Sequence, residues 1–170
     1  MKINFTKIID TIDRWMHRDY YSLTEASNIG ELELLIKKGV NINAKDKYGS
    51  TALRTALGYG HLEMVKLLIE NGADINAKNN FDYTALMWAS EKGHLETVKY
   101  LIESGANINA KDNDGETALM EASRWGDLEM VKLLVENGAD VNIKNNDGYT
   151  ALDFARDEEI KELLRKAGAK

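Results

Sequence analysis

The chain has 170 residues, no cysteine, no proline and a formal net charge of −6 at pH 7. The absence of cysteine excludes disulfide bonds and thiol catalysis, and it favours a cytoplasmic protein. The acidic balance argues against nucleic acid as the main partner, because binding to phosphates needs a basic face. Charged residues are interspersed through the first twenty positions, so neither a signal peptide nor a membrane segment is expected.

Residues 1–19 form the first predicted element. Apolar residues recur there at helical spacing: Phe5, Ile8, Ile9, Ile12, Trp15 and Met16. This stripe predicts an N-terminal helix that caps the segments following it. A docking helix for a partner is the alternative, whereas the interspersed aspartates disfavour a helix on a membrane surface.

The rest of the chain is periodic. The string Thr-Ala-Leu begins four times at equal intervals, at Thr51, Thr84, Thr117 and Thr150. The same interval separates Gly39, Gly72, Gly105 and Gly138, and also Lys45, Lys78, Lys111 and Lys144. A fixed period of this length indicates units that bury their apolar faces only by stacking on one another.

Alignment on this period divides the chain into five units. Residues 46–78, 79–111 and 112–144 are three full repeats without gaps. Residues 20–45 form a degenerate N-terminal repeat, and residues 145–170 form a truncated C-terminal capping repeat. Both end units carry the polar outer face that a terminal repeat needs.

Each full repeat is expected to contain two short amphipathic helices. In 46–78 the first runs from Thr51 to about Leu57, and the second runs from Leu62 to Glu70. Thr51 is a candidate N-cap, and Gly72 can end the second helix in the left-handed conformation. Polar segments rich in Asn, Asp and Gly join the pairs and predict hairpin-like finger turns. Equivalent core places are expected for Leu53, Leu86, Leu119 and Leu152, with Ala56, Ala89, Ala122 and Ala155 beside them.

Three runs of the first full repeat, 46–53, 60–68 and 71–78, resemble the ankyrin repeat. The next two repeats contain similar runs at the corresponding positions. The resemblance covers about residues 20–170 and implies an all-α ankyrin-repeat solenoid of helix-turn-helix pairs with finger turns. Two departures stand out. The place of the family's first-helix histidine holds Arg54, Met87, Met120 and Asp153, so its imidazole hydrogen bonds are not expected. Asp82 replaces a turn glycine and is expected to distort that finger, although Asp tolerates positive φ.

No constellation of residues predicts catalysis or metal binding. The three histidines, His17, His61 and His94, have no partners at ligand spacing. Asp112 opens a run like a calcium loop, but the twelfth place holds Ser123 where a carboxylate is needed. The chain is therefore predicted not to be an enzyme and to use no metal, no cofactor and no small-molecule substrate.

Residues that vary between equivalent places indicate a binding surface. The resemblance implies that the first helices and fingers line a concave groove that binds proteins. The predicted protein-binding residues there are Tyr48, Tyr59, Phe81, Tyr83, Trp88, Glu91, Lys92, Asp114, Glu116, Glu121, Arg124, Trp125 and Tyr149. Clustered exposed aromatic residues are typical of interface hot spots, and Trp88 and Trp125 are expected to contribute to binding more than to stability.

The predicted function is a non-catalytic protein–protein interaction module. It is expected to be a monomer that binds one protein partner of unknown identity, without nucleic acid or membrane. The alternative is an inhibitor or immunity-type protein that plugs the active site of a partner enzyme or toxin. Net acidity would suit a basic target in that case.

Overall fold

The computed structural model describes residue 18 and residues 23–24, 29–58 and 61–170. Apart from Arg18, the N-terminal helix predicted for residues 1–19 lies outside the described residues. In the described part the helices are α3 (Ile29–Lys37), α4 (Ala52–Gly58), α5 (Leu62–Glu70), α6 (Ala85–Glu91), α7 (Leu95–Glu103), α8 (Ala118–Trp125), α9 (Leu128–Glu136), α10 (Ala151–Phe154) and α11 (Glu158–Lys166). That part contains no strand, and Lys45 and Thr51 form an isolated antiparallel bridge.

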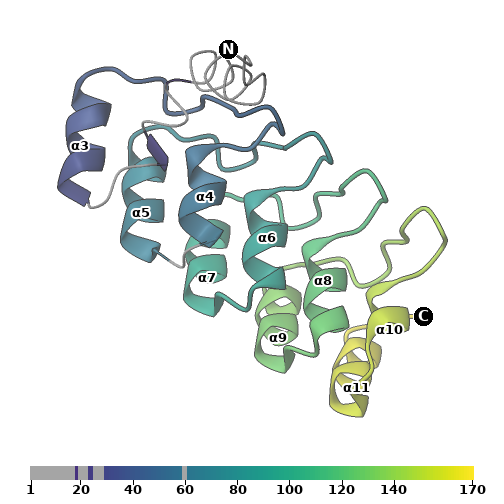
Figure 1. The fold of residues 1–170 in the computed structure, drawn as a ribbon. Helices are drawn as coiled ribbons and strands as arrows, with labels where there is room; N and C mark the ends of the chain where they lie inside the picture. Colours follow the sequence, from purple (N-terminus) through teal and green to yellow (C-terminus); the bar gives the residue numbers. More distant parts are fainter. Residues whose placement is uncertain (1–17, 19–22, 25–28, 59–60) are drawn as a thin grey trace, which may run out of the picture.

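The helices form two stacked layers (Figure 1). Helices α4, α6, α8 and α10 make the inner layer, in which each packs on the next. Helices α3, α5, α7, α9 and α11 make the outer layer, with the same order of neighbours. The connections into the inner helices project together from one side of the stack as the predicted fingers. The fold is therefore the predicted all-α repeat array of paired helices.

The helix ends follow from local chemistry. The side chains of Thr84 and Thr117 cap α6 and α8 by accepting hydrogen bonds from the backbone N–H groups of Met87 and Met120, at 3.4 Å each. Helix α5 covers 62–70 as predicted, and Gly72 follows its C-cap with φ of 91°. Glycine takes this left-handed conformation at little steric cost, so the second helix ends there.

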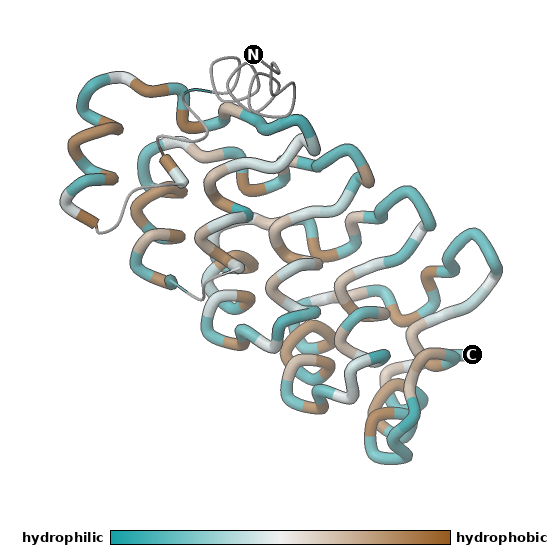
Figure 2. The backbone as a smooth tube through the Cα atoms, in the orientation of Figure 1, coloured by the Kyte–Doolittle hydropathy of each residue, from teal (hydrophilic) through white to brown (hydrophobic). Residues whose placement is uncertain are grey.

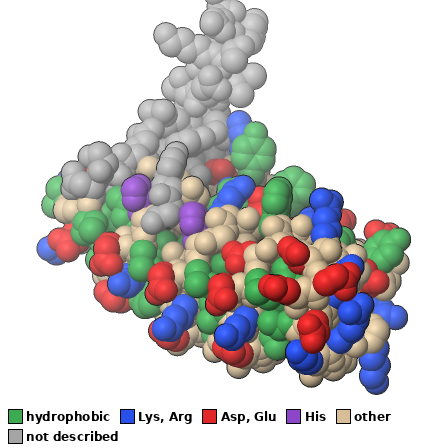
Figure 3. Space-filling view, turned by 90° about the horizontal axis from the view of Figure 1, so that it is seen from below, with side chains coloured by type: hydrophobic (Ala, Val, Ile, Leu, Met, Phe, Trp, Pro, Cys, Tyr) green, Lys and Arg blue, Asp and Glu red, His purple; other side chains and the backbone are tan. Residues whose placement is uncertain are grey.

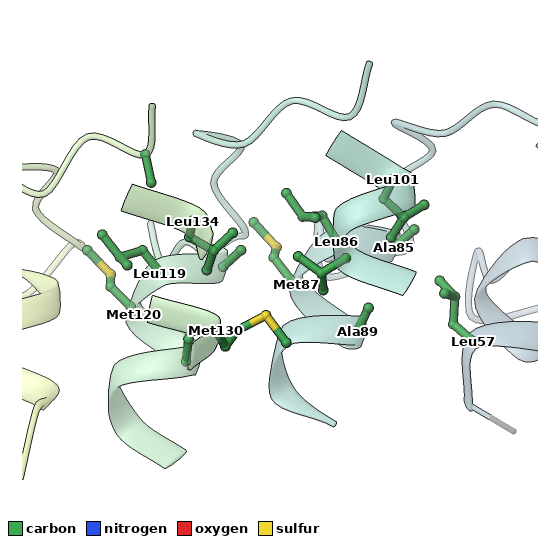
Figure 4. Packing of buried hydrophobic residues seen from close by; sticks show 14 of the residues in the cluster. Leu57, Ala85, Leu86, Met87, Ala89, Leu101, Leu119, Met120, Met130 and Leu134 are labelled. Carbon is green, nitrogen blue, oxygen red and sulfur yellow. The ribbon is translucent and has the colours of Figure 1, made fainter. Parts of the chain in front are cut away.

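The core lies between the two layers. Leu53, Leu86 and Leu119 are each at most 2% exposed and occupy the predicted equivalent places on α4, α6 and α8. Figure 4 shows Leu86 and Met87 of α6 and Leu119 and Met120 of α8 between the helices, with Leu101 and Leu134 from the outer layer. Figure 2 shows the same division along the backbone, with hydrophobic positions on the helices and hydrophilic residues along most of the fingers. Burial of this interface is the main stabilising term of the stack.

The last repeat departs from the predicted pattern. Leu152 is only half-buried, whereas its three equivalents are buried. Among the described helices α10 has α8 as its inner-layer neighbour on one side and none on the other, so its outer face is not covered in the same way. Ala155 is buried as predicted, but it lies just beyond the end of α10 with extended backbone.

In the fingers, hydrogen bonds from polar side chains connect each repeat to the next. Asn76 donates from Nδ2 to the carbonyl of Gly105 at 3.4 Å and accepts at Oδ1 from the N–H of Asn107 at 2.8 Å. Asn43, Asn109 and Asn142 make the equivalent pairs of bonds to the following segment. The Nζ groups of Lys45, Lys78 and Lys111 each donate to the carbonyl of the equivalent lysine in the next repeat, at 2.8 to 2.9 Å. Each finger thus satisfies backbone groups of the next one.

Asp82 does not disrupt its finger. It has φ of 58°, and its N–H donates to the carbonyl of Asn79 at 3.0 Å, as the N–H of Gly49 does to Asp46. Its carboxylate also lies 3.0 Å from Lys78 Nζ. The expected distortion is therefore absent from the hydrogen-bond pattern, because Asp adopts the left-handed conformation and keeps the same turn bonds.

Truncating a central core leucine should strongly destabilise the stack. Leu119→Ala is expected to lower the free energy of unfolding by about 2–5 kcal/mol, because it removes a fully buried side chain and leaves a cavity. Leu152→Ala is the matched control and should cost clearly less, since its side chain is half-buried. Urea unfolding of both variants measures this, and equal losses would contradict the assigned difference in burial.

The hydrogen bonds of the asparagine side chains between fingers should contribute measurably to the free energy of unfolding. Asn109→Ala removes a donor and an acceptor that bridge to Gly138 and Asp140. The expected loss is about 1–2 kcal/mol, since a typical net hydrogen bond is worth about 1 kcal/mol. Asn109→Asp keeps the acceptor for Asp140 N–H but sets a carboxylate oxygen against the Gly138 carbonyl, so it should not recover the loss. Urea unfolding tests both variants. An unchanged free energy of unfolding in Asn109→Ala would show that water replaces these hydrogen bonds without cost.

Candidate functional site: the groove of inner helices and fingers

Most of the predicted binding residues lie on the fingers and the inner helices. The fingers carry Tyr48, Phe81, Tyr83, Asp114, Glu116 and Tyr149, and the inner helices or their ends carry Trp88, Glu91, Lys92, Glu121, Arg124 and Trp125. Tyr59 lies outside the described residues. Both groups belong to the same side of the stack, where the fingers meet the inner layer (Figure 1). We call this surface the groove.

The groove contains an open hollow of about 370 Å³ between the second and third full repeats. Most of the residues that line it are among those predicted to bind a partner, and Arg54 and Asn79 complete the lining: Arg54, Asn79, Phe81, Tyr83, Trp88, Glu91, Glu121, Arg124 and Trp125. Trp88 on α6 and Trp125 at the end of α8 therefore border the same space, as expected for neighbouring inner helices. We call this space the central hollow.

The two tryptophans differ in burial. Trp125 is 63% exposed, whereas Trp88 is half-buried and packs against the core. The Arg54 guanidinium lies 4.2 Å and Lys92 Nζ 4.7 Å from the Trp88 ring centroid, and the Tyr83 ring meets it edge-on at 6.4 Å. Cations over an indole face are attracted by its quadrupole. Trp88 thus helps to hold the groove together, in line with the alternative that this ring packs against a neighbouring repeat.

Arg124 joins two carboxylates of the third repeat. Its Nη2 donates to both oxygens of Glu116 at 2.6 Å, and its Nη1 donates to Glu121 at 2.8 Å. The same guanidinium lies 4.3 Å from the ring centroid of Phe154. Glu121 is only 7% exposed, and burial raises the pKa of its carboxyl above the ordinary value although Arg124 opposes the shift. Arg124 is therefore the group that keeps this buried charge tolerable.

A second acidic contact lies on α6. The Tyr83 hydroxyl donates to Glu91 Oε2 at 3.1 Å, and Lys92 Nζ lies 2.7 Å from Glu91 Oε1. Burial, with Glu121 and Glu91 nearby, raises the pKa of the Tyr83 hydroxyl, so it stays protonated and acts as a donor. The floor of the central hollow thus combines aromatic rings with two carboxylates.

Exposed aromatic side chains mark the rim of the groove. Among the described residues, the exposed aromatic side chains are Tyr48, Phe81 and Tyr149 on fingers and Trp125 at the end of α8. The other large hydrophobic side chains that are exposed in that part of the chain, Ile29 and Leu34, lie on α3. Exposed aromatic residues therefore concentrate on the groove. Viewed from below (Figure 3), acidic and basic side chains are interspersed among hydrophobic ones.

The predicted binding residues do not include Arg54 and Phe154, although the sequence places Phe154 among the variable first-helix positions of the groove. Arg54 stands at the place of the family histidine, yet it covers Trp88 and donates to Ser50 Oγ at 3.1 Å. The Phe154 ring contacts the Arg124 guanidinium and forms a T-shaped pair with the Tyr149 ring. The available signal was variation, since both residues occupy places that hold different side chains in different repeats.

The described residues offer no group of three or more His, Cys, Asp or Glu side chains placed to hold a metal ion. The two described histidines, His61 and His94, precede α5 and α7 at equivalent places in successive repeats. None of the helices that the structure describes is long and apolar enough to cross a membrane.

Removing Arg124 should make stability depend more strongly on pH. In Arg124→Gln the buried Glu121 loses its counter-charge, so its pKa should rise further above the value in the unfolded chain. Ionisation of Glu121 then disfavours the folded state as pH rises past the unfolded pKa of about 4.3. We expect a loss of about 1–3 kcal/mol at neutral pH and a smaller one near pH 4.

Urea unfolding at the two pH values measures this difference. The double variant Arg124→Gln/Glu121→Gln should recover part of the loss at neutral pH, because the uncompensated carboxylate is gone. A loss that is equal at both pH values and unaffected by the second substitution would show that Arg124 acts only through its packing on Phe154.

Comparison with protein families agrees with this geometry. A model described as ankyrin repeats (3 copies) matches residues 22–112, and one described as ankyrin repeats (many copies) matches residues 106–155. No curated protein matches the chain. Ankyrin repeats are generally protein–protein interaction modules and are typically non-catalytic. With matches that extend over both the first and the last full repeat, the chain belongs to the ankyrin-repeat family.

Proposed function

We propose that this protein is a non-catalytic, monomeric interaction module that binds one protein partner through the groove. The observation that carries the proposal is the concentration of exposed aromatic side chains on the fingers and on the end of α8. Tyrosine and tryptophan are enriched at the centres of protein interfaces, where they bury a large area at low entropic cost.

The framework supports binding because it is rigid. The fingers are tied to one another by the Asn and Lys bonds, and the inner helices share one core. A surface that is ordered before binding loses little conformational entropy when a partner docks. The central hollow adds a recess beside the exposed aromatic side chains, so that the groove can accept a protruding side chain of the partner.

Substitution of exposed groove residues should weaken binding without unfolding the chain. Trp125→Ala and Phe81→Ala are each expected to lower affinity by at least about tenfold, equivalent to about 1.4 kcal/mol. Both side chains are 63% exposed, so the melting midpoint should change little. Trp88→Ala should lower both affinity and stability, because the ring packs against the core.

The measurement is capture of partners from a lysate of the source organism, with mass spectrometry and then titration of the captured protein against each variant. Lys99→Ala on the exposed face of α7 is the control and should bind like the unmodified chain. A partner whose affinity responds to Lys99→Ala but not to the groove variants would place the binding surface on the outer layer. If the captured partner is an enzyme that loses activity on binding, the module acts as an inhibitor.

A further inference from the structure

The α8–α10 junction of the inner layer (Figure 1) holds a carboxylate between donors from two repeats. Arg124 Nη2 donates to both oxygens of Glu116 at 2.6 Å, and Asn145 Nδ2, on the next finger, donates to Glu116 Oε1 at the longer distance of 3.5 Å. The Arg124 guanidinium lies 4.3 Å from the centroid of the Phe154 ring. That ring forms a T-shaped pair with Tyr149, with 6.2 Å between the centroids. The junction is thus a carboxylate site whose ligand belongs to the chain itself.

The α4–α6 junction, two repeats earlier, has the same arrangement of side chains. The Arg54 guanidinium lies 4.2 Å from the centroid of the Trp88 ring, and Tyr83 forms a T-shaped pair with that ring at 6.4 Å. Arg54 comes from another place on its helix than Arg124, yet its guanidinium covers the equivalent ring. The residues at equivalent places are Trp88 for Phe154, Tyr83 for Tyr149, Asn79 for Asn145 and Ser50 for Glu116.

A carboxylate is the part of this arrangement that the α4–α6 junction lacks. Arg54 Nη1 donates to the neutral hydroxyl of Ser50 at 3.1 Å. In the part of the chain that the structure describes, no carboxylate forms an ion pair with Arg54, and its Nε is buried without a hydrogen-bond partner. Oδ1 of Asn79 accepts two backbone hydrogen bonds within its own turn, at 2.9 Å each, so Nδ2 is the group that can donate outward. Donors are therefore in excess here.

The place that Glu116 fills in the other junction adjoins open space in this one. Ser50, Arg54, Asn79 and Tyr83 together line a cavity of about 10 Å³. Arg54, Asn79 and Tyr83 also line the central hollow, together with Trp88. Serine is much smaller than glutamate, so Ser50 fills this place only in part. A side chain that enters the hollow therefore meets the guanidinium and the amide.

The other charged groups of the hollow already have partners. Glu121 accepts from Arg124 at 2.8 Å, and Glu91 Oε1 lies 2.7 Å from Lys92 Nζ. Among the charged residues that line the hollow, all of them in the described part of the chain, Arg54 is the one without an opposite charge in contact. Its uncompensated charge favours an anionic group.

We propose that the α4–α6 side of the central hollow binds a glutamate side chain of the protein partner, with its carboxylate held by Arg54 and Asn79. Glu116 is the chain's own example of this contact. Hydrogen bonds between a guanidinium and a carboxylate are charge-assisted and about twice as strong as neutral ones. The net charge of −6 opposes the contact only weakly, because salt at about 0.15 M screens charges beyond about 8 Å. This proposal rests on the proposed function, because it specifies one contact of the same groove.

The test uses short peptides in place of the unidentified partner, at about 0.15 M salt. The full chain, labelled with ¹⁵N, is titrated with acetyl-Gly-Glu-Gly-amide while the indole N–H signal of Trp88 and the side-chain amide signals of Asn79 are followed by NMR. The matched peptides carry glutamine, the neutral isostere, or lysine at the central position. We expect saturable millimolar binding of the glutamate peptide and an affinity lower by about tenfold or more for the glutamine peptide.

Three substitutions locate the site. Ser50→Glu supplies the carboxylate within the chain, as Glu116 does, and should lower the affinity for the glutamate peptide at least about tenfold. Arg54→Gln should have a similar effect, because it removes the charged donor. Arg156→Gln removes an exposed positive charge beyond α10 and should leave the affinity unchanged. The comparison of peptides uses the unmodified chain, and so it decides the matter even if a variant folds poorly.

Three results would overturn the proposal: equal binding of the glutamine peptide, tighter binding of the lysine peptide, or full affinity for the glutamate peptide in folded Ser50→Glu. Such results would leave the proposed function intact if lysate capture still depends on Trp125 and Phe81. Conversely, capture that ignores the groove variants would refute the proposed function, whatever the peptides do.

Discussion

The whole structure depends on one constraint, that no repeat can satisfy its own backbone or bury its own apolar face. The finger of each repeat leaves carbonyl and N–H groups that the asparagine of the preceding repeat completes, as Asn76 does for Gly105 and Asn107. The inner helix likewise leaves part of its leucine face to be covered by the next helix pair. Since both needs are met at the same spacing along the chain, the polar and apolar contacts reinforce a single register.

Because the contacts between repeats use only some positions, the other positions can differ from one repeat to the next. Positions that point into the stack keep Leu and Ala, whereas the groove positions hold Thr55, Trp88, Glu121 and Phe154 at equivalent places. A repeated scaffold therefore carries a surface that is not repeated. The side chains along the groove therefore differ from one inner helix to the next.

Sequence reasoning predicted most of the fold because its signals are local. Thr84 and Gly72 mark helix ends through capping and left-handed backbone, and the helices begin and end within about one residue of the expected places. The half-burial of Leu152 could not be read from periodicity, since it depends on what packs beyond α10. In the groove, the pattern placed Trp88 and Arg124 on the right helices but could not show their contacts. Side-chain conformers bring Arg54 onto Trp88 and Arg124 onto Glu116, which lies on the preceding finger.

The short inner helix of the last repeat also bears on how the chain folds. Because contacts link each repeat mainly to its neighbours, structure can nucleate within a pair of repeats and spread by adding one unit at a time. Helix α10 has four residues and, among the described helices, one inner-layer neighbour, so the C-terminal unit is stacked on one side only. Amide protons there should exchange through local opening sooner than those of α6 and α8, which are enclosed on both sides. Local opening is therefore expected to begin at this end of the stack and to reach the central hollow later.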